Sequence, residues 1–164
     1  MQCCVGAFAI NQLDVARLRH GLAELASGDP ERAENIRQRC DDAVRRLAPD
    51  FPGDAASGIL DESEDSARRF ASFANDKPCP VLDPGTGRCE LYEARPVTCR
   101  VFGPPVRMGD GNALGHCELC FVGASKEVVA ACEMAVPNAL EAGLVDEIGV
   151  GRETVVAYAL LRES

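Results

Sequence analysis

Nine cysteines among 164 residues are the feature of this sequence with the most chemistry. Cysteine thiolates are soft ligands for zinc, for iron and for iron–sulfur clusters. An odd number of cysteines does not pair off into disulfides, and the first residues lack the basic segment and apolar stretch of a secretory signal. We therefore expect a cytoplasmic protein whose thiols stay reduced and bind metal.

Two of the nine cysteines fall on apolar stripes of predicted helices. Cys40 lies four residues after Ile36 and four residues before Val44, and Cys132 has valines at the same two spacings. A free cysteine on the apolar face of a helix behaves as a small hydrophobic residue. The spacing therefore predicts that Cys40 and Cys132 belong to the hydrophobic core.

The other seven cysteines lie in segments predicted to be loop, turn or hairpin, where metal ligands usually occur. The predicted metal ligands are Cys3, Cys4, Cys79, Cys89, Cys99, Cys117 and Cys120. Cys117 and Cys120 have the two-residue separation that lets two thiolates of one turn bind one ion. Neighbouring side chains of an extended segment point to opposite sides. Cys3 and Cys4 therefore either serve two adjacent metals, or one binds while the other packs or stays reactive.

The number of donors leaves one site or two open. A structural zinc takes four donors, and so does a four-iron cluster, so seven thiols exceed one site and fall one short of two. His116 is a candidate eighth donor, although an exposed loop histidine is the favoured interpretation. His20 lies in the middle of a predicted helix and is expected to be solvated.

Helical periodicity predicts a scaffold of three helices before the cysteine-rich segment. Asn11 is the expected N-cap of the first helix, which Gly28 ends. Asp29 and Pro30 begin the second, because a capping acid and a proline at the first helical position are typical start signals. A third, shorter helix is expected at residues 62–74.

The cysteine-rich segment has a different character. Residues 79–92 contain two short apolar runs around a Pro/Gly turn, which predicts a small β-hairpin. Residues 103–115 include six glycines or prolines and are expected to form an irregular surface loop. Helical candidates follow at residues 125–136, 137–148 and 152–162.

These elements predict a mostly α-helical α+β fold, in which a helical scaffold supports a small β-hairpin and cysteine-rich loops around a metal site. The length favours one domain spanning residues 1–164, with a helical C-terminal extension at 125–162.

Charge and missing motifs exclude other functions. A net charge of -9 repels phosphate backbones and anionic lipids, and no apolar run is long enough to cross a bilayer. We therefore expect neither a nucleic-acid partner nor a membrane partner. The sequence has no G-x-G-x-x-G loop, no P-loop and no convincing Ser-His-Asp or paired-carboxylate arrangement. An enzyme is thus the less favoured class.

The sequence of residues 79–82 (CPVL) and 87–102 (GRCELYEARPVTCRVF) resembles the YkgJ-type cysteine-cluster family, which is also described as a zinc- or iron-chelating domain. Cys3 and Cys4 resemble the end of the family's opening C-x-x-C-C motif, and Cys117 and Cys120 match its closing cysteines. The resemblance covers about residues 3–120. The first cysteine of C-x-x-C-C would precede Met1, so either the natural start lies upstream or the protein lacks one ligand.

The resemblance implies metal binding through the cysteines, and flagellin lysine-N-methylase is similar in carrying the same module. The prediction is a metal-binding protein that holds an iron–sulfur cluster or zinc in a structural or electron-transfer role. The alternative is a small redox or methyl-transfer enzyme, or an enzyme accessory subunit, that uses the same cysteines.

Arg95 and Arg100 flank Cys99 and are expected either to donate hydrogen bonds to sulfur or to pair with surface carboxylates. Tyr92 and Phe102 are expected to pack around the site.

Overall fold

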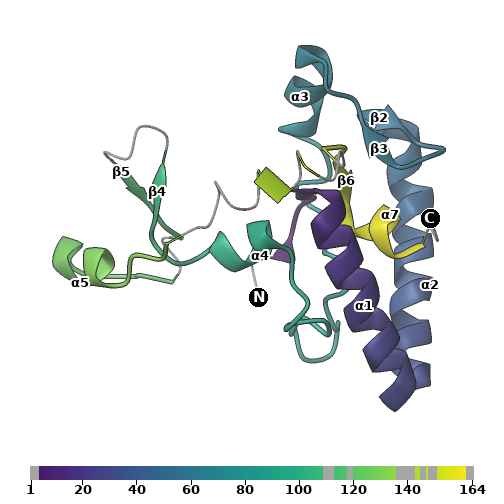
Figure 1. Cartoon of the computed structure of the whole chain (residues 1–164), viewed down its shortest axis with the longest axis horizontal. Coiled ribbons are helices and arrows are strands. Elements are labelled where there is room, and N and C mark those ends of the chain that lie inside the picture. Colours follow the sequence, from purple (N-terminus) through teal and green to yellow (C-terminus); the bar gives the residue numbers. More distant parts are fainter. Residues whose placement is uncertain are drawn as a thin grey trace.

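A computed structural model describes residues 4–108, 113–117, 120–135, 143–144, 147 and 151–161 of the chain. Its scaffold is a pair of long helices that lie side by side, α1 (Gln12–Gly28) and α2 (Pro30–Leu47) (Figure 1). Both predicted N-caps are confirmed, since the side chains of Asn11 and Asp29 each accept a backbone N–H from the first turn that follows. The helix boundaries predicted from these signals are therefore correct.

A short C-terminal helix, α7 (Val156–Leu161), packs against both long helices. The strand before it, β6 (Thr154–Val155), pairs antiparallel with β1 (Ala9–Ile10). The helix predicted to begin at residue 152 thus begins later, because two of its residues are used for this pairing. As a result, segments from the two ends of the chain share one core.

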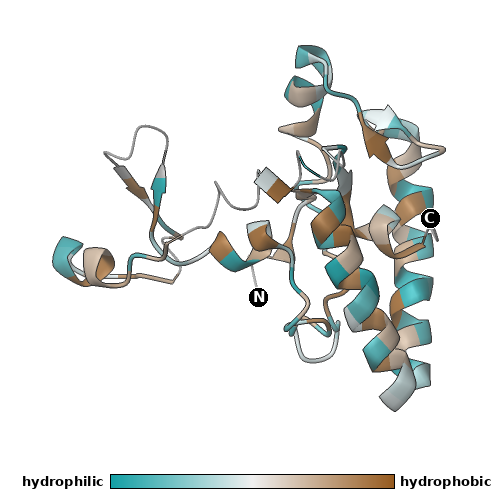
Figure 2. Ribbon diagram, viewed as in Figure 1, coloured by the Kyte–Doolittle hydropathy of each residue, from teal (hydrophilic) through white to brown (hydrophobic). Residues whose placement is uncertain are grey.

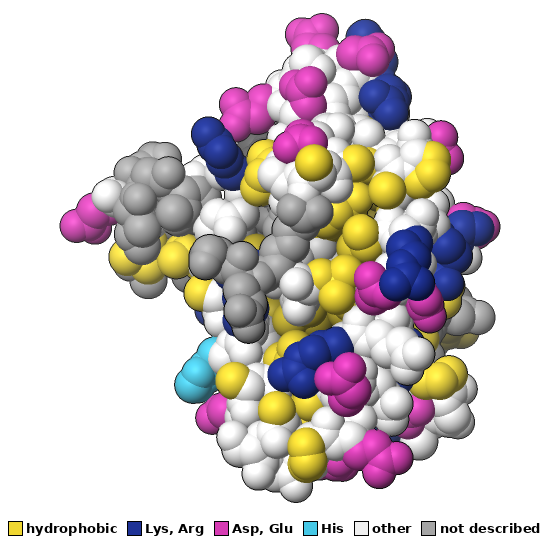
Figure 3. Space-filling model, turned by 90° about the vertical axis from the view of Figure 1, so that its right-hand side faces the viewer, with side chains coloured by type: hydrophobic (Ala, Val, Ile, Leu, Met, Phe, Trp, Pro, Cys, Tyr) yellow, Lys and Arg dark blue, Asp and Glu magenta, His cyan; other side chains and the backbone are white. Residues whose placement is uncertain are grey.

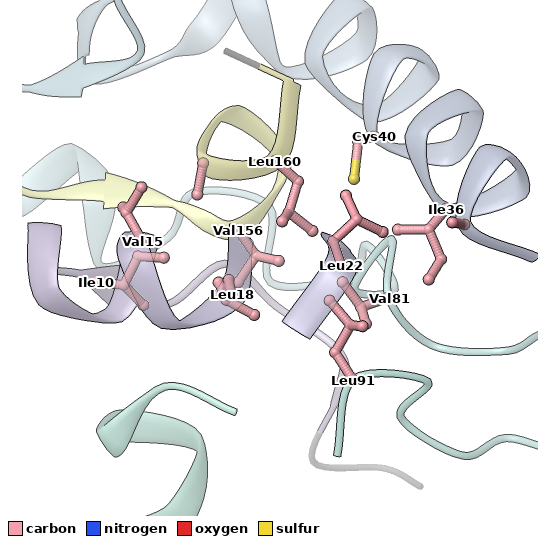
Figure 4. Packing of buried hydrophobic residues seen from close by; sticks show 12 residues of the cluster. Ile10, Val15, Leu18, Leu22, Ile36, Cys40, Val81, Leu91, Val156 and Leu160 are labelled. Carbon is pink, nitrogen blue, oxygen red and sulfur yellow. The ribbon is translucent and has the colours of Figure 1, made fainter. Parts of the chain in front are cut away.

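The main hydrophobic core lies between α1, α2 and α7 and extends into the cysteine-rich segment through Val81 and Leu91. Figure 2 shows hydrophobic and hydrophilic residues alternating along both long helices, as expected for amphipathic helices. Cys40 is completely buried, and Figure 4 shows it between α2 and the side chains of Leu22 and Leu160. The prediction that Cys40 is a core residue is confirmed.

The same prediction for Cys132 is wrong. Helix α5 (Lys126–Ala131) ends before Cys132, which is exposed at its C-cap, and Val128 is 51% exposed. Figure 1 shows the reason: α5 lies in a part of the chain that projects away from the helical scaffold, so this stripe does not face the core between α1, α2 and α7. Periodicity identified the stripe but could not show which surface it faces.

Alanine substitutions at these two cysteines should therefore differ in their effect on stability. We expect Cys40→Ala to lower the free energy of unfolding by about 1–2 kcal/mol, because it leaves a small cavity in a packed core. Cys132→Ala is the matched control and should change it by less than about 0.5 kcal/mol. Urea titrations of both variants measure this difference, and equal effects would contradict the placement of Cys40.

Helix α3 (Glu64–Phe70) begins after Ser63, two residues later than predicted, and ends earlier. Its buried residue is Ser66, whose hydroxyl donates to the carbonyl of Pro52, whereas Ala67 and Ala71 are exposed, although helical spacing would allow both to face a core. Phe73 is buried in a second cluster with Phe51, Val155 and Tyr158. The 3-10 turn η2 (Ala48–Asp50) and the hairpin of β2 (Gly53–Asp54) with β3 (Ile59–Leu60) connect α2 to α3.

The stretch predicted to be an irregular loop contains a β-hairpin instead. Strand β4 (Val106–Met108) pairs antiparallel with β5 (Ala113–Gly115). The two prolines of this stretch precede β4, so they remove no N–H from the β4–β5 ladder. Arg107 forms a two-point ion pair with Glu133, which ties the segment after α5 to the hairpin. We call the described residues within 106–135 the arm; it contains β4, β5, α5 and the segments that connect and follow them. Most of the predicted helix 137–148 lies outside the described residues.

Charged side chains of both signs lie next to one another on the face shown in Figure 3. Among the described residues, some charged side chains form local helix pairs, such as Arg45 with Asp41 and Arg68 with Asp65, and such surface pairs contribute little each. Within the described residues, no helix is long and apolar enough to span a bilayer.

Candidate metal centre

Five cysteines line one cavity of about 280 Å³ beside the helical scaffold. They come from four separate parts of the chain and are Cys4, Cys79, Cys89, Cys99 and Cys120. The described residues that line this cavity include no carboxylate and no imidazole. A donor set made only of thiols fits zinc, iron or an iron–sulfur cluster and does not fit magnesium or calcium.

A tight turn brings Cys79 and Cys89 to the same cavity. The predicted hairpin is reduced to a single bridge between Leu82 and Cys89, and the backbone N–H of Asp83 donates to the carbonyl of Arg88 at 2.9 Å. Gly87 has a φ of +65°, a conformation that favours glycine and closes the turn. The ten-residue separation of the two cysteines thus becomes a short distance across the turn.

The N-terminal segment runs alongside the start of this turn. The N–H of Cys79 donates to the carbonyl of Cys4 at 2.8 Å, and Gly6 donates to Lys77 at 2.8 Å. These backbone hydrogen bonds fix Cys4 next to Cys79 without using either thiol. Cys3 lies outside the described residues.

Cys99 lies on α4 (Val97–Val101), a helix of five residues that has no buried residue of its own. Pro96 is its N-cap residue, so the helix begins directly after this proline and two residues before Cys99. The hydroxyl of Thr98 donates to the carbonyl of Ala9 in β1 at 3.5 Å. The helix is therefore held against the scaffold by a few specific contacts.

Cys117 and Cys120 form the tight turn that their spacing predicted, since the N–H of Cys120 donates to the carbonyl of Cys117 at 3.0 Å. The N–H of Cys117 in turn donates to the carbonyl of Gly103 at 3.1 Å. Only Cys120 lines the cavity; Cys117 is half-buried and is not among the residues that line it. This pair enters from the arm, whereas the other four cavity cysteines belong to segments packed on the scaffold.

Electrostatics show that the four scaffold thiols lie near one another. Burial raises the pKa of Cys79 to about 12, and negative charge at Cys99, Cys89 and Cys4 adds to this effect. Burial also raises the pKa of Cys99 to about 12, with further contributions from Cys89 and Cys4. Among the described residues, no three cysteine, histidine, aspartate or glutamate side chains already stand close enough to hold one metal ion. Metal binding requires that the ligating thiols lose their protons.

The raised pKa values predict a loss of stability of the metal-free protein at alkaline pH. Cys79 and Cys99 keep their protons in the folded state up to a pKa of about 12, whereas the ordinary thiol pKa is 9.0. Above pH 9.0 the unfolded chain therefore binds fewer protons than the folded one, and stability falls as pH rises. Urea titrations of chelator-treated protein at about pH 8 and about pH 10 test this sign, and greater stability at the higher pH would contradict it.

Glu90 is the residue that anchors the turn, and the sequence interpretation missed it. Its side chain is only 6% exposed and pairs with two arginines of α2: Arg32 donates to one carboxylate oxygen at 2.6 Å, and Arg39 donates to the other. The Nε of Arg39 also donates to the carbonyl of Pro80 at 2.8 Å. Both arginines lie on the polar side of α2, where the spacing of apolar residues gives no sign of a partner.

Arg95 and Arg100 line the cavity, and each donates to backbone carbonyls of the preceding loop. Arg95 donates to Tyr92 at 3.0 Å and stacks on its ring, with the guanidinium carbon 3.6 Å from the ring centre. Arg100 donates to the carbonyls of Arg95 and Glu93. Neither arginine forms an ion pair with a carboxylate of the described residues. Tyr92 and Phe102 line the same cavity as expected and are about half exposed.

The two histidines do not line the cavity. His116 is exposed and packs edge-on against Phe121, and His20 is exposed beside Glu24 on α1. Both positions agree with the interpretation favoured from the sequence.

Comparison with known proteins supports one family. Residues 1–120 match the model of the CxxCxxCC family, described as "Putative zinc- or iron-chelating domain". No curated protein and no solved structure shows significant similarity to the chain. The match covers the cavity cysteines and confirms the resemblance to a cysteine-cluster family, whereas α7, which completes the core, lies beyond it. The chain belongs to the CxxCxxCC family of zinc- or iron-chelating domains.

Proposed function

We propose that the chain holds one iron–sulfur cluster in the cysteine-lined cavity, with Cys4, Cys79, Cys89 and Cys99 as its ligands. The observation that carries this proposal is the convergence of these four thiols, from three separate segments packed on the scaffold, around one cavity. Four thiolates are the ligand set of a four-iron cluster.

The size of the cavity supports a cluster over a single zinc ion. A tetrahedral zinc occupies only the space between its four sulfur atoms, with Zn–S bonds of about 2.3 Å. A volume of about 280 Å³ leaves room for several metal and sulfide atoms. The cluster, when bound, would supply one-electron chemistry; the protein's own residues hold it, limit its exposure to water and place cations beside it.

Arg95 and Arg100 support an electron-transfer role. Four thiolates bring negative charge into the cavity, and two guanidinium groups beside them favour the more negative, reduced state of the centre. The side chains of Tyr92 and Phe102 are about half exposed and line the same cavity, so a centre bound there would lie near the surface, which suits electron exchange with a partner.

We assign Cys120 and Cys117 a secondary role. Cys120 lines the cavity but enters from the arm, and Cys117 remains outside the cavity lining. Cys120 is then a fifth thiol beside a four-ligand centre, where it can replace one of the four ligands. Alternatively, it can complete a site in which Cys3 also takes part.

We further propose that residues 1–164 form one domain, since α7 packs into the same core as α1 and α2. The need for reduced thiols supports a cytoplasmic location.

Metal and sulfide analysis of protein purified without oxygen tests the proposal. We expect iron and acid-labile sulfide in equal amounts, together with the visible absorption of a sulfide-bridged cluster. If the protein contains zinc alone, at one ion per chain, the cavity holds a structural zinc ion and the cluster proposal is wrong. Absence of any stoichiometric metal, including after reconstitution with ferrous iron and sulfide, would overturn the proposal.

A further inference from the structure

Asp14 is an acidic residue buried where a charge is costly. It lies in the first turn of α1, is only 2% exposed, and one of its carboxylate oxygens faces the start of α4. A carboxylate removed from water needs strong partners, or its burial destabilises the fold. The partners of Asp14 therefore indicate what it does.

One partner is the backbone N–H of Val97, which donates to Oδ1 of Asp14 at 3.0 Å from 83 residues further along the chain. Another partner is Arg17, whose guanidinium is 3.3 Å from the same oxygen and is about half exposed. Val97 is the first residue of α4, and Cys99 follows two residues later.

Helix α4 lacks a cap from its own sequence. Its N-cap residue is Pro96, whose side chain cannot accept a hydrogen bond, and the first N–H groups of any helix have no partner inside it. A carboxylate at this end satisfies one of these groups and interacts favourably with the helix dipole. Asp14 therefore acts as the N-terminal cap of α4, although it belongs to α1 and not to the segment before α4.

We infer that Asp14 is a positioning residue for Cys99: its carboxylate caps α4 from α1 and thereby holds the Cys99 thiol at the metal-binding cavity. A five-residue helix with no buried residue is not stable alone, so its contacts with the scaffold set its position. The hydroxyl of Thr98 also donates to the scaffold, to the carbonyl of Ala9, and this hydrogen bond is longer, at 3.5 Å. The effect on metal uptake rests on the proposed function; the capping of α4 does not.

Two substitutions of Asp14 separate its hydrogen bond from its charge. In Asp14→Asn the amide oxygen still accepts the N–H of Val97, and in Asp14→Ala nothing does. In metal-free protein we expect Asp14→Ala to speed hydrogen exchange of residues 97–101 about tenfold, with Asp14→Asn close to the wild type. Reconstitution with ferrous iron and sulfide should give Asp14→Ala less than about half of the wild-type cluster content. Glu24→Ala, which removes an exposed acid from the same helix, should behave as the wild type in both assays.

Val97→Pro removes the same hydrogen bond from the donor side and leaves α1 untouched. Proline is favoured at the first position of a helix, and Pro96 has a ψ of 153°, which a following proline accepts. We expect this variant to lose cluster content as Asp14→Ala does, and the double variant to lose no more than either alone. If Asp14→Ala fails to fold by circular dichroism, Val97→Pro decides the question.

The outcomes separate the two claims. Wild-type exchange and cluster content in both Asp14→Ala and Val97→Pro would overturn the inference, and so would equal damage in Asp14→Asn and Asp14→Ala. A wild-type protein that takes up no metal would refute the proposed function, while the exchange of residues 97–101 would still decide whether Asp14 caps α4.

Discussion

Replacing Cys79 by serine is expected to reduce the metal content of the purified protein to about a tenth or less of the wild-type value. Cys79 adjoins Cys4 through a backbone hydrogen bond and shares the cavity with Cys89 and Cys99. A serine hydroxyl is nearly the same size as a thiol but is a poor ligand for soft metals. The loss should therefore reflect chemistry rather than packing.

Two matched variants make this result specific. Cys120→Ser should keep most of the metal, because the four scaffold thiols remain, and Cys132→Ser should keep all of it, because Cys132 is exposed at the end of α5. Iron, zinc and sulfide contents of the three variants, purified in parallel, measure the ranking. A Cys79→Ser protein with full metal content would remove this residue from the ligand set.

The second large effect is expected at Glu90. Glu90→Ala should lower the free energy of unfolding by about 1–3 kcal/mol, since it leaves Arg32 and Arg39 without their shared carboxylate. The cost stays below that of a fully buried ion pair because both arginines are partly exposed and can bind water. The turn that carries Cys89 should also lose its anchor on α2, so cluster content should fall.

Glu133→Ala provides the control for the Glu90 variant. It also removes a carboxylate paired with an arginine, but the pair lies in the arm and is more exposed, so its loss should cost less than about 1 kcal/mol. Urea titrations and iron content of both variants are the measurements. Equal loss of stability and metal in the two would show that the Glu90 pairs have no special role in placing the turn.

The sequence was sufficient for the parts of the fold that follow local rules. Asn11, Asp29 and Pro30 are start signals whose effect depends on neighbouring residues only, and the positions they predicted are correct. Cys40 was placed correctly because α2 does face a core. Cys132 lies on the same kind of stripe but is exposed, because α5 does not face the core between α1, α2 and α7.

The parts of the site that could not be predicted depend on contacts between distant segments. Asp14 meets Val97, and Glu90 meets Arg32 and Arg39, across separations of more than fifty residues. Each of these charged residues is compatible with an exposed helix or loop when only its neighbours are known. Spacing alone therefore suggested candidate thiols but not the carboxylates that hold their segments in place.

The most direct test is a crystal structure of the protein loaded without oxygen, with anomalous differences measured at the iron edge and at the zinc edge. We expect one iron centre in the cavity, bonded to the sulfur atoms of Cys4, Cys79, Cys89 and Cys99. A metal bound elsewhere, or a centre in the cavity without these four sulfur ligands, would contradict it.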